Sequence, residues 1–277
     1  MIVHAEYNMV PALKILWKEG FADEDSYIDF FFNRRFKPEN TFVYIKNGSP
    51  VSMATVLNAS LYQNGAFLPA GYIYGVATSK KHQGMGLSTA ILDYINRKYP
   101  TAFLVPSTEE LFRFYEKREF KPAFTLSEVI LNICDLKTPD RNFKSETVSP
   151  EEYKAVRDSH FTSDGYICWD IEAITYALME NEFSGGSALK IQATEKRSKG
   201  TVNGVILYRK DSDRLLIIET TLPFQILCDT AYILMKDEGV SSCSVRLAAN
   251  ETLTARPFGL LRAGFAVNNG YCNLVLD

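Results

Sequence analysis

The sequence contains no long uninterrupted hydrophobic run: none approaches the roughly 20 apolar residues that a helix needs to cross a bilayer. Residues 1–14, "MIVHAEYNMVPALK", also lack a basic segment followed by an apolar one, so no secretory signal is predicted. We therefore expect a cytoplasmic protein that has no membrane partner.

Neither an excess of one charge nor a set of paired cysteines is present. The formal net charge of −3 argues against a nucleic-acid partner, because such proteins need a basic face. The 5 cysteines are an odd number without close pairs, so we expect free thiols, with no disulfide framework and no metal site. With 277 residues, 46% of them hydrophobic, the chain can form one large or two medium domains.

The most informative segment is a turn, "SKKHQGMGLST", which follows the extended run 72–79. Gly84 and Gly86 lie two residues apart, and glycine permits positive φ and close approach of a ligand. Apolar residues then recur at helical spacing, at Leu87, Ala90, Ile91, Tyr94 and Ile95. Such a strand-to-helix turn gathers backbone N–H groups at the positive end of a helix, which suits a pyrophosphate.

Two better-known phosphate motifs are excluded at this turn. The Gly-Lys-Ser/Thr step of a Walker loop is missing, and the G-x-G-x-x-G spacing of dinucleotide sites fails. Taken alone, the two glycines are equally compatible with an ordinary structural turn.

The residues after the turn add a second motif. Residues 101–105 read as a short buried strand, and 109–120, "EELFRFYEKREF", as a helix. Together the two motifs resemble the GNAT superfamily of acyl-CoA-dependent N-acetyltransferases. Residues 81–86 match that family's loop Q/R-x-x-G-x-G/A, and 114–120 match its helix end F-Y-x-x-x-G-F. Lys81 replaces the usual Gln or Arg, and Glu119 replaces a glycine, which suggests a different exit from the helix.

The resemblance implies acetyl-CoA as co-substrate and assigns its contacts. The backbone of Val76, Ala77 and Thr78 would pair with the pantetheine arm and offer a donor to the oxyanion. The implied pyrophosphate contacts are Lys81, His82, Gln83, Gly84, Met85, Gly86, Leu87 and Ser88.

Tyr115 is the implied catalytic residue, as the general acid that protonates the leaving thiolate. The alternative is that Tyr115 is only an aromatic core residue. No general base can be assigned, since the nearby glutamates can all be solvated carboxylates. His4 and His160 lie outside the motifs, and the consecutive residues Phe30, Phe31 and Phe32 are interpreted as core rather than acceptor cleft. The "DEDS" run from Asp23 is interpreted as a solvated loop.

The predicted organisation is two tandem domains of an α/β (α+β) class, each a mixed, mostly antiparallel sheet with helices on both faces. Helices are predicted at 8–21 and 25–36, followed by a hairpin that turns at Asn47-Gly48. A polar break at 135–142 separates a catalytic domain, 1–136, from a second domain, 142–277.

The second half repeats the plan without its chemistry. Ser149 and Glu152 predict a capping box at a helix start. Three strands follow, with polar turns at 195–200 and 211–213. Residues 221–223, Thr-Leu-Pro, stand where a phosphate loop would be, and aligning 256–265 with the first helix end places Leu260 at the position of Tyr115. We expect a degenerate GNAT-like domain that supports the first or acts as its lid.

The predicted function is transfer of an acetyl group to a primary amine of a small molecule or peptide. The alternative is a non-catalytic acyl-CoA-binding or sensing protein, because no base is identified. A purely structural tandem domain would require the glycine loop to be coincidental. The sequence leaves the acceptor and the oligomeric state open.

Overall fold

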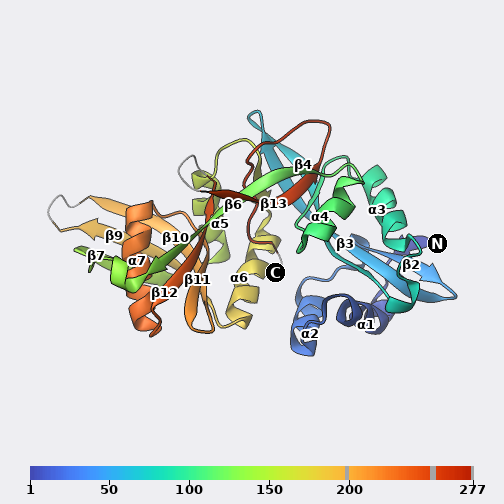
Figure 1. Cartoon of the computed structure of the whole chain (residues 1–277), viewed down its shortest axis with the longest axis horizontal. Helices are drawn as coiled ribbons and strands as arrows, with labels where there is room; N and C mark the ends of the chain where they lie inside the picture. Colours follow the sequence, from blue (N-terminus) through green and yellow to red (C-terminus); the bar gives the residue numbers. More distant parts are fainter. Residues whose placement is uncertain (197–199, 250–253, 276–277) are drawn as a thin grey trace. The chain divides into compact units, whose positions relative to one another are not determined.

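The computed structural model describes residues 1–196, 200–249 and 254–275. The chain forms two compact units (Figure 1). Unit 1 comprises Met1–Leu61, Leu68–Lys121 and Gly259–Ala266, and unit 2 comprises Tyr62–Phe67, Pro122–Phe258 and Val267–Asp277. Each unit contains a mixed, mostly antiparallel sheet with helices, so the predicted fold class is confirmed.

Unit 1 is built on a sheet with the order β1-β2-β3-β4-β5-β13. Its strands are β1 (Ile2–His4), β2 (Thr41–Lys46), β3 (Ser49–Gln63), β4 (Ala66–Thr78), β5 (Ala102–Leu104) and β13 (Ala255–Arg262). Its helices are α1 (Val10–Phe21), α2 (Asp25–Arg34), α3 (Leu87–Lys98) and α4 (Glu109–Glu116), with short 3-10 turns at Tyr7–Met9, Pro38–Asn40 and Lys80–His82. β4 and β5 are parallel, whereas β5 and β13 are antiparallel.

Strand alternation directs the two faces of β4 to different helices, because successive side chains point to opposite faces of a sheet. Ile73 belongs to a buried cluster with Ile91 and Ile95 of α3. Its neighbour Tyr74 instead packs against Trp17 of α1, with ring centroids 5.5 Å apart. Helices therefore cover both faces of this sheet.

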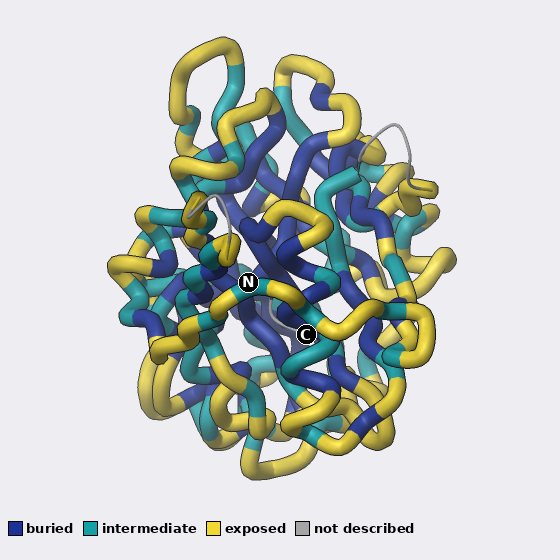
Figure 2. The backbone as a smooth tube through the Cα atoms, turned by 90° about the vertical axis from the view of Figure 1, so that its left-hand side faces the viewer, coloured by how far each residue is buried: buried dark blue, intermediate teal, exposed yellow. Residues whose placement is uncertain are grey.

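The predicted hairpin between β2 and β3 is confirmed. Asn47 and Gly48 have φ of 51° and 77°, the left-handed values that a two-residue hairpin turn requires. The turn residues 47–49 and 64–66 are exposed, whereas the strands that they connect contain runs of buried residues. Figure 2 shows exposed backbone mainly in the outer loops and buried backbone inside. The hydrophobic pattern and the turn residues thus specify the same register.

In unit 2 the strands follow the order β6-β12-β11-β10-β9-β7. Its strands are β6 (Lys121–Asn132), β7 (Arg141–Thr147), β9 (Ser187–Glu195), β10 (Thr201–Asp211), β11 (Arg214–Thr220) and β12 (Ser242–Ala248), with β8 (Tyr166–Trp169) outside this order. Its helices are α5 (Pro150–His160), α6 (Ile171–Phe183) and α7 (Phe224–Asp237), with a 3-10 turn at Ile133–Asp135. Only part of the predicted turn at 195–200 can be compared, because 197–199 lie outside the described residues.

The start of α5 confirms the predicted capping box. The Ser149 hydroxyl accepts a hydrogen bond from the Glu152 N–H at 3.2 Å, and the Glu152 carboxylate accepts one from the Ser149 N–H at 3.3 Å. Pro150 occupies the first turn, where its missing N–H costs nothing.

Two strands are placed differently from the prediction. Residues 256–265 were predicted as a helix end, but most of them form β13, in which Leu260 pairs with Leu104 of β5. This extended segment forms hydrogen bonds with the edge of β5. Pairing between distant segments therefore determines its conformation, and the helical prediction was wrong. Conversely, β6 was assigned to the first domain, yet it pairs with β12 in unit 2. The contiguous ranges 1–136 and 142–277 therefore differ from the observed division.

Candidate active site

The candidate site in unit 1 begins where two parallel strands stop pairing. β4 pairs with β5 at Gly71↔Ala102 and Tyr72↔Phe103. β5 ends at Leu104, whereas β4 continues to Thr78. Val76, Ala77 and Thr78, the predicted pantetheine contacts, thus lie beyond the last parallel pair. On the opposite edge the Ser52 hydroxyl donates to the Ala77 carbonyl at 2.9 Å, which anchors this end of β4 to β3.

Gly75 bends β4 immediately before these residues, and it was not among the site residues predicted from the sequence. Its φ is +62°, and a Cβ built there would lie 3.2 Å from the Trp17 ring. A glycine inside a strand pattern is the signal that could have identified it, because it marks an irregularity or a close approach. The bend separates the paired half of β4 from the half that faces the gap left by β5.

The glycine loop that follows has the geometry that the sequence predicted. Gly84 has φ of +77° and Gly86 of +73°, and at neither position does a built Cβ meet another atom within 4 Å. Gly86 immediately precedes α3, whose first N–H groups have no partner within the helix. The loop is thus an open cradle of backbone at a helix N-terminus.

Side chains around the loop hold its shape. The Glu19 carboxylate of α1 accepts a hydrogen bond from the Lys80 N–H at 2.9 Å. The His82 ring pairs with the Ser79 hydroxyl at 2.8 Å, so this ring has a structural partner. Lys81, Gln83 and Met85 are exposed, Ser88 is half-buried, and the Leu87 side chain is buried. Of these predicted contacts, Leu87 can therefore offer its backbone but not its side chain.

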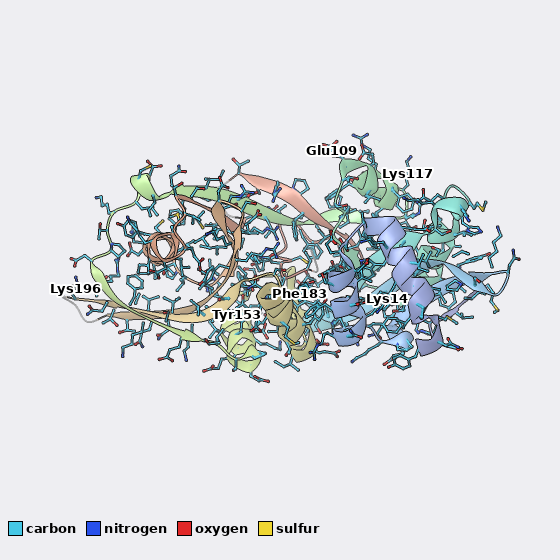
Figure 3. The ribbon with its side chains drawn as sticks, turned by 90° about the horizontal axis from the view of Figure 1, so that it is seen from below. Lys14, Glu109, Lys117, Tyr153, Phe183 and Lys196 are labelled. Carbon is cyan, nitrogen blue, oxygen red and sulfur yellow. The ribbon has the colours of Figure 1, made fainter. Side chains whose placement is uncertain are left out.

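Tyr115 lies near the end of α4, a helix that Thr108 caps by accepting from the Leu111 N–H at 3.2 Å. Glu109 and Lys117, labelled in Figure 3, mark the two ends of this helix. The Tyr115 side chain is 7% exposed and shares a hydrophobic cluster with Ile91 of α3 and with Val76. The structure therefore brings the predicted acid and the predicted pantetheine contact together.

Burial raises the pKa of Tyr115 to about 12, and the neighbouring Arg118 cation opposes this rise. A phenol with this pKa remains protonated throughout the neutral range, so its hydroxyl is available as a donor. Its burial also fits the alternative that Tyr115 is a core residue. The burial of Tyr115 is therefore consistent with both a proton donor and a core residue.

The exit from α4 corrects one expectation. Glu119 has φ of +68°, the left-handed conformation that a glycine adopts most easily at a helix end. The chain therefore leaves the helix as a glycine would, and the substitution does not change the exit. The Glu119 carboxylate instead pairs with Arg262 of β13 at 3.2 Å.

The other singled-out residues have surroundings of their own. His4 packs on Phe42, with ring centroids 4.6 Å apart, and His160 is an exposed residue of α5 in unit 2. Phe31 and Phe32 are buried, as the core interpretation predicted, and Phe30 is half-buried. Asp23 is not simply solvated, because it accepts from the Trp17 indole N–H at 2.7 Å.

Unit 2 contains the corresponding junction between parallel strands. β11 pairs with β12 from Leu215↔Cys243 to Ile217↔Val245, and Thr221-Leu222-Pro223 then leads into α7. The Thr221 hydroxyl accepts from the Val205 N–H at 2.9 Å, and a Cβ on Gly204 would lie 2.6 Å from Leu222. The chain itself fills this turn.

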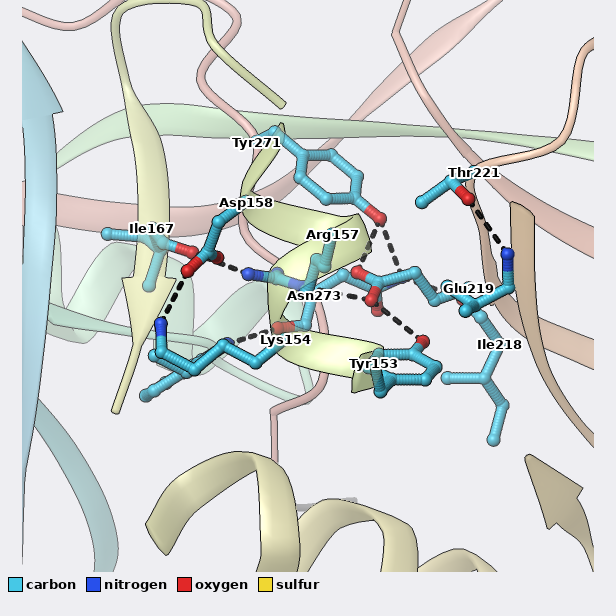
Figure 4. A network of polar contacts seen from close by, with 12 residues as sticks. Tyr153, Lys154, Arg157, Asp158, Ile167, Ile218, Glu219, Thr221, Tyr271 and Asn273 are labelled. Carbon is cyan, nitrogen blue, oxygen red and sulfur yellow. Dashed lines mark hydrogen bonds and ion pairs between the residues drawn. The ribbon is translucent and has the colours of Figure 1, made fainter. Parts of the chain in front are cut away.

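A buried polar network closes the strand edge beside that turn (Figure 4). The Arg157 guanidinium donates to the Glu219 carboxylate at 2.9 Å, and both side chains are fully buried. The Tyr153 and Tyr271 hydroxyls donate to the same carboxylate at 3.0 and 2.8 Å. The Asn273 amide donates to the Ile218 carbonyl of β11 at 2.7 Å, so the carboxyl-terminal segment occupies this edge.

All 5 cysteines are free in the structure. In the described ranges, no group of three or more His, Cys, Asp or Glu side chains is arranged to hold a metal ion. The described helices include none that is long and apolar enough to cross a membrane.

Comparison with known proteins assigns the first half of the chain. Residues 4–123 match the family model described as an acetyltransferase (GNAT) domain. This match covers both the glycine loop and the Tyr115 helix, so the resemblance to GNAT acetyltransferases is confirmed and this part of the chain is a GNAT domain. A search of curated proteins finds no match.

Solved structures show the same fold over nearly the whole chain. A probable N-acyltransferase from Enterococcus faecalis V583 is 16% identical, with a TM-score of 0.73 over 95% of this chain and 72% of that chain. Eis1 from Mycobacterium abscessus is 13% identical, with a TM-score of 0.66 over 95% and 73%. Saccharomyces cerevisiae N-myristoyltransferase with bound myristoyl-CoA is 10% identical, with a TM-score of 0.54 over 95% and 82%. At these identities the likeness shows the fold.

Proposed function

We propose that the chain transfers an acetyl group from acetyl-CoA to a primary amine of a small molecule or peptide, by direct attack in a ternary complex. The observation that carries the proposal is the open glycine cradle at the start of α3, beside the gap between β4 and β5 and the buried phenol of Tyr115. A GNAT domain supports acyl transfer in general. Acetyl as the group and an amine as the acceptor belong to the proposal.

The residues of unit 1 fit an acyl-CoA. The N–H groups from His82 to Leu87 and the Lys81 side chain would hold the pyrophosphate, with Ser88 adding a hydroxyl. The pantetheine arm would lie along Val76–Thr78, past the bend at Gly75. In unit 2 the turn at Thr221-Leu222-Pro223 is filled by the chain, which supports a domain that binds no acyl-CoA.

The chemistry follows from these positions. The amine nitrogen forms a bond to the thioester carbon, and the carbon–sulfur bond breaks. A backbone N–H near Val76–Thr78 would donate to the tetrahedral oxyanion. Tyr115 would give its proton to the departing thiolate, and the proton of the amine would leave through water, because no side chain is assigned as its base.

A screen tests the proposal. Acetyl-CoA is incubated with a panel of small amines and amino-terminal peptides, and free thiol release is followed with time. The expected result is thiol release that depends on both protein and amine. Tight acetyl-CoA binding without release for any amine would contradict the proposal and support a non-catalytic acyl-CoA binder.

A further inference from the structure

Arg118 lies in the turn after α4, and its guanidinium donates hydrogen bonds to uncharged oxygen atoms. One terminal nitrogen donates to the Phe114 carbonyl at 2.5 Å, and the other donates to the Thr89 hydroxyl at 2.5 Å. The guanidinium carbon also lies over the Phe114 ring, 3.5 Å from its centroid. These contacts fix the planar group in one orientation, which is the geometry for which arginine is suited.

The two hydrogen bonds join the two helices that carry the candidate site. Thr89 is in the first turn of α3, the helix that starts at the glycine cradle. Phe114 precedes Tyr115 in the last turn of α4. The Arg118 N–H also donates to the Tyr115 carbonyl at 2.8 Å, so the backbone of Arg118 belongs to the same turn as the phenol.

The charge of Arg118 acts on the phenol as well. Arg118 opposes the rise in the pKa of Tyr115 that burial causes, and burial lowers the pKa of Arg118 itself. Its Nε is buried and makes no hydrogen bond to the described part of the chain. The guanidinium is thus a partly desolvated cation that contacts both the first turn of α3 and the turn of α4 that contains Tyr115.

We propose that Arg118 is a positioning residue for Tyr115, which ties the last turn of α4 to the first turn of α3. This inference rests on the proposed function. A diphosphate bound at the start of α3 would then restrict the position of the Tyr115 phenol. The coupling passes through the hydrogen bonds of the Arg118 guanidinium, because these bonds hold the two helix ends together. Misplacing a catalytic group by about 1 Å costs roughly 10²-fold in rate, so such a brace has a measurable effect.

Hydrogen exchange measures this coupling without any acceptor. The probe is adenosine 3′-phosphate 5′-diphosphate, which carries the diphosphate and lacks the pantetheine arm. In the parent protein, binding should slow exchange in the first turn of α3 and at residues 117–120. In Arg118→Met, only the α3 protection should remain. Arg113→Met is the matched control, because Arg113 is on α4, just before the turn that contains Arg118, and makes an exposed ion pair with Glu109.

Kinetics supply the second readout once an acceptor is known. Arg118→Met should lower kcat by about 10- to 100-fold, with the KM for acetyl-CoA changed by less than about threefold. Arg118→Lys should recover part of the rate, because it keeps the charge and loses the fork. Thr89→Val should lower kcat less, and adding it to Arg118→Met should change little, since the two residues act through one contact.

Each outcome decides the inference. Equal protection at 117–120 in Arg118→Met and the parent would overturn it. So would loss of nucleotide affinity with an unchanged kcat, which would make Arg118 a phosphate contact, or a fall in rate that only follows lost thermal stability. Nucleotide binding with the predicted exchange pattern, but without acetylation of any amine, would refute the proposed function and leave the coupling standing. No binding by the parent would overturn both.

Discussion

The two units contain the same junction, a pair of parallel strands that diverge before a helix, and they treat it in opposite ways. In unit 1 the edge beyond the β4–β5 pairing leads to two glycines with positive φ and open space around them. In unit 2 the edge beyond the β11–β12 pairing receives Asn273, and Leu222 packs against Gly204. One junction is shaped for a ligand, whereas the chain itself occupies the other.

The difference shows that the topology alone does not make a site. Both junctions have a strand, a turn and a helix N-terminus, which provide unsatisfied N–H groups. What distinguishes them is the residues of the turn. Before α3 two glycines with positive φ have open space around them, whereas before α7 the Thr221 hydroxyl accepts from the Val205 N–H and Leu222 lies against Gly204.

The largest expected effect concerns the chemistry of unit 1. Tyr115→Phe removes one hydroxyl and keeps the ring that packs on Phe114. If the phenol protonates the thiolate, kcat should fall by about 10²–10⁴-fold, with acetyl-CoA affinity nearly unchanged. Steady-state kinetics and calorimetry check this with the acceptor from the screen. Parental turnover by Tyr115→Phe would show that Tyr115 is a core residue only.

The second effect concerns the closure of unit 2. Glu219→Ala leaves the fully buried Arg157 without its anion, and removing one partner of such a pair costs about 3–5 kcal/mol. Denaturant unfolding of the variant measures this loss. Asp211→Ala is the control, because Asp211 forms a half-exposed pair with Arg214 that should contribute less than about 1 kcal/mol. Equal losses in the two variants would mean that the buried network does not hold the closed junction together.

The smallest effect concerns the helix exit in unit 1. Glu119→Gly relieves a left-handed conformation that costs roughly 1–2 kcal/mol in other residues, and it loses one surface ion pair of about 0–1 kcal/mol. The free energy of unfolding should therefore rise by up to about 2 kcal/mol. Glu119→Gln, which keeps the strained backbone, should show no gain. A destabilised Glu119→Gly would mean that the pair with Arg262 outweighs the strain.

Much of the fold could be predicted from the sequence because local signals agreed with the tertiary structure. Asn47-Gly48 fixed a hairpin, and the Ser149–Glu152 spacing fixed a helix start. The glycine loop could be predicted for the same reason, since positive φ and open space are properties of the residue itself. The residues of the glycine loop therefore determine its backbone geometry.

The remaining features depend on pairing between distant segments, which no local pattern reports. β13 pairs with β5 across more than half of the chain, and β6 pairs with β12, so strands that are distant in the sequence are neighbours in the sheet. The position of Arg118 could not be predicted from the sequence, because its hydrogen-bond partner Thr89 is on α3, far from it in the chain. Gly75 did have a local signal, a glycine within a strand, but a bend could be assigned only with Trp17 in place.

Calorimetric titration with acetyl-CoA tests the contrast between the two junctions most directly. We predict one site per chain, abolished in Gly84→Val because a branched side chain at that φ blocks the cradle. Gly48→Val is the matched control: Gly48 has the same φ of +77° and the same open surroundings in the β2–β3 turn, and this variant should keep the one site. Two equivalent sites per chain, or undiminished affinity in a folded Gly84→Val protein, would contradict the account.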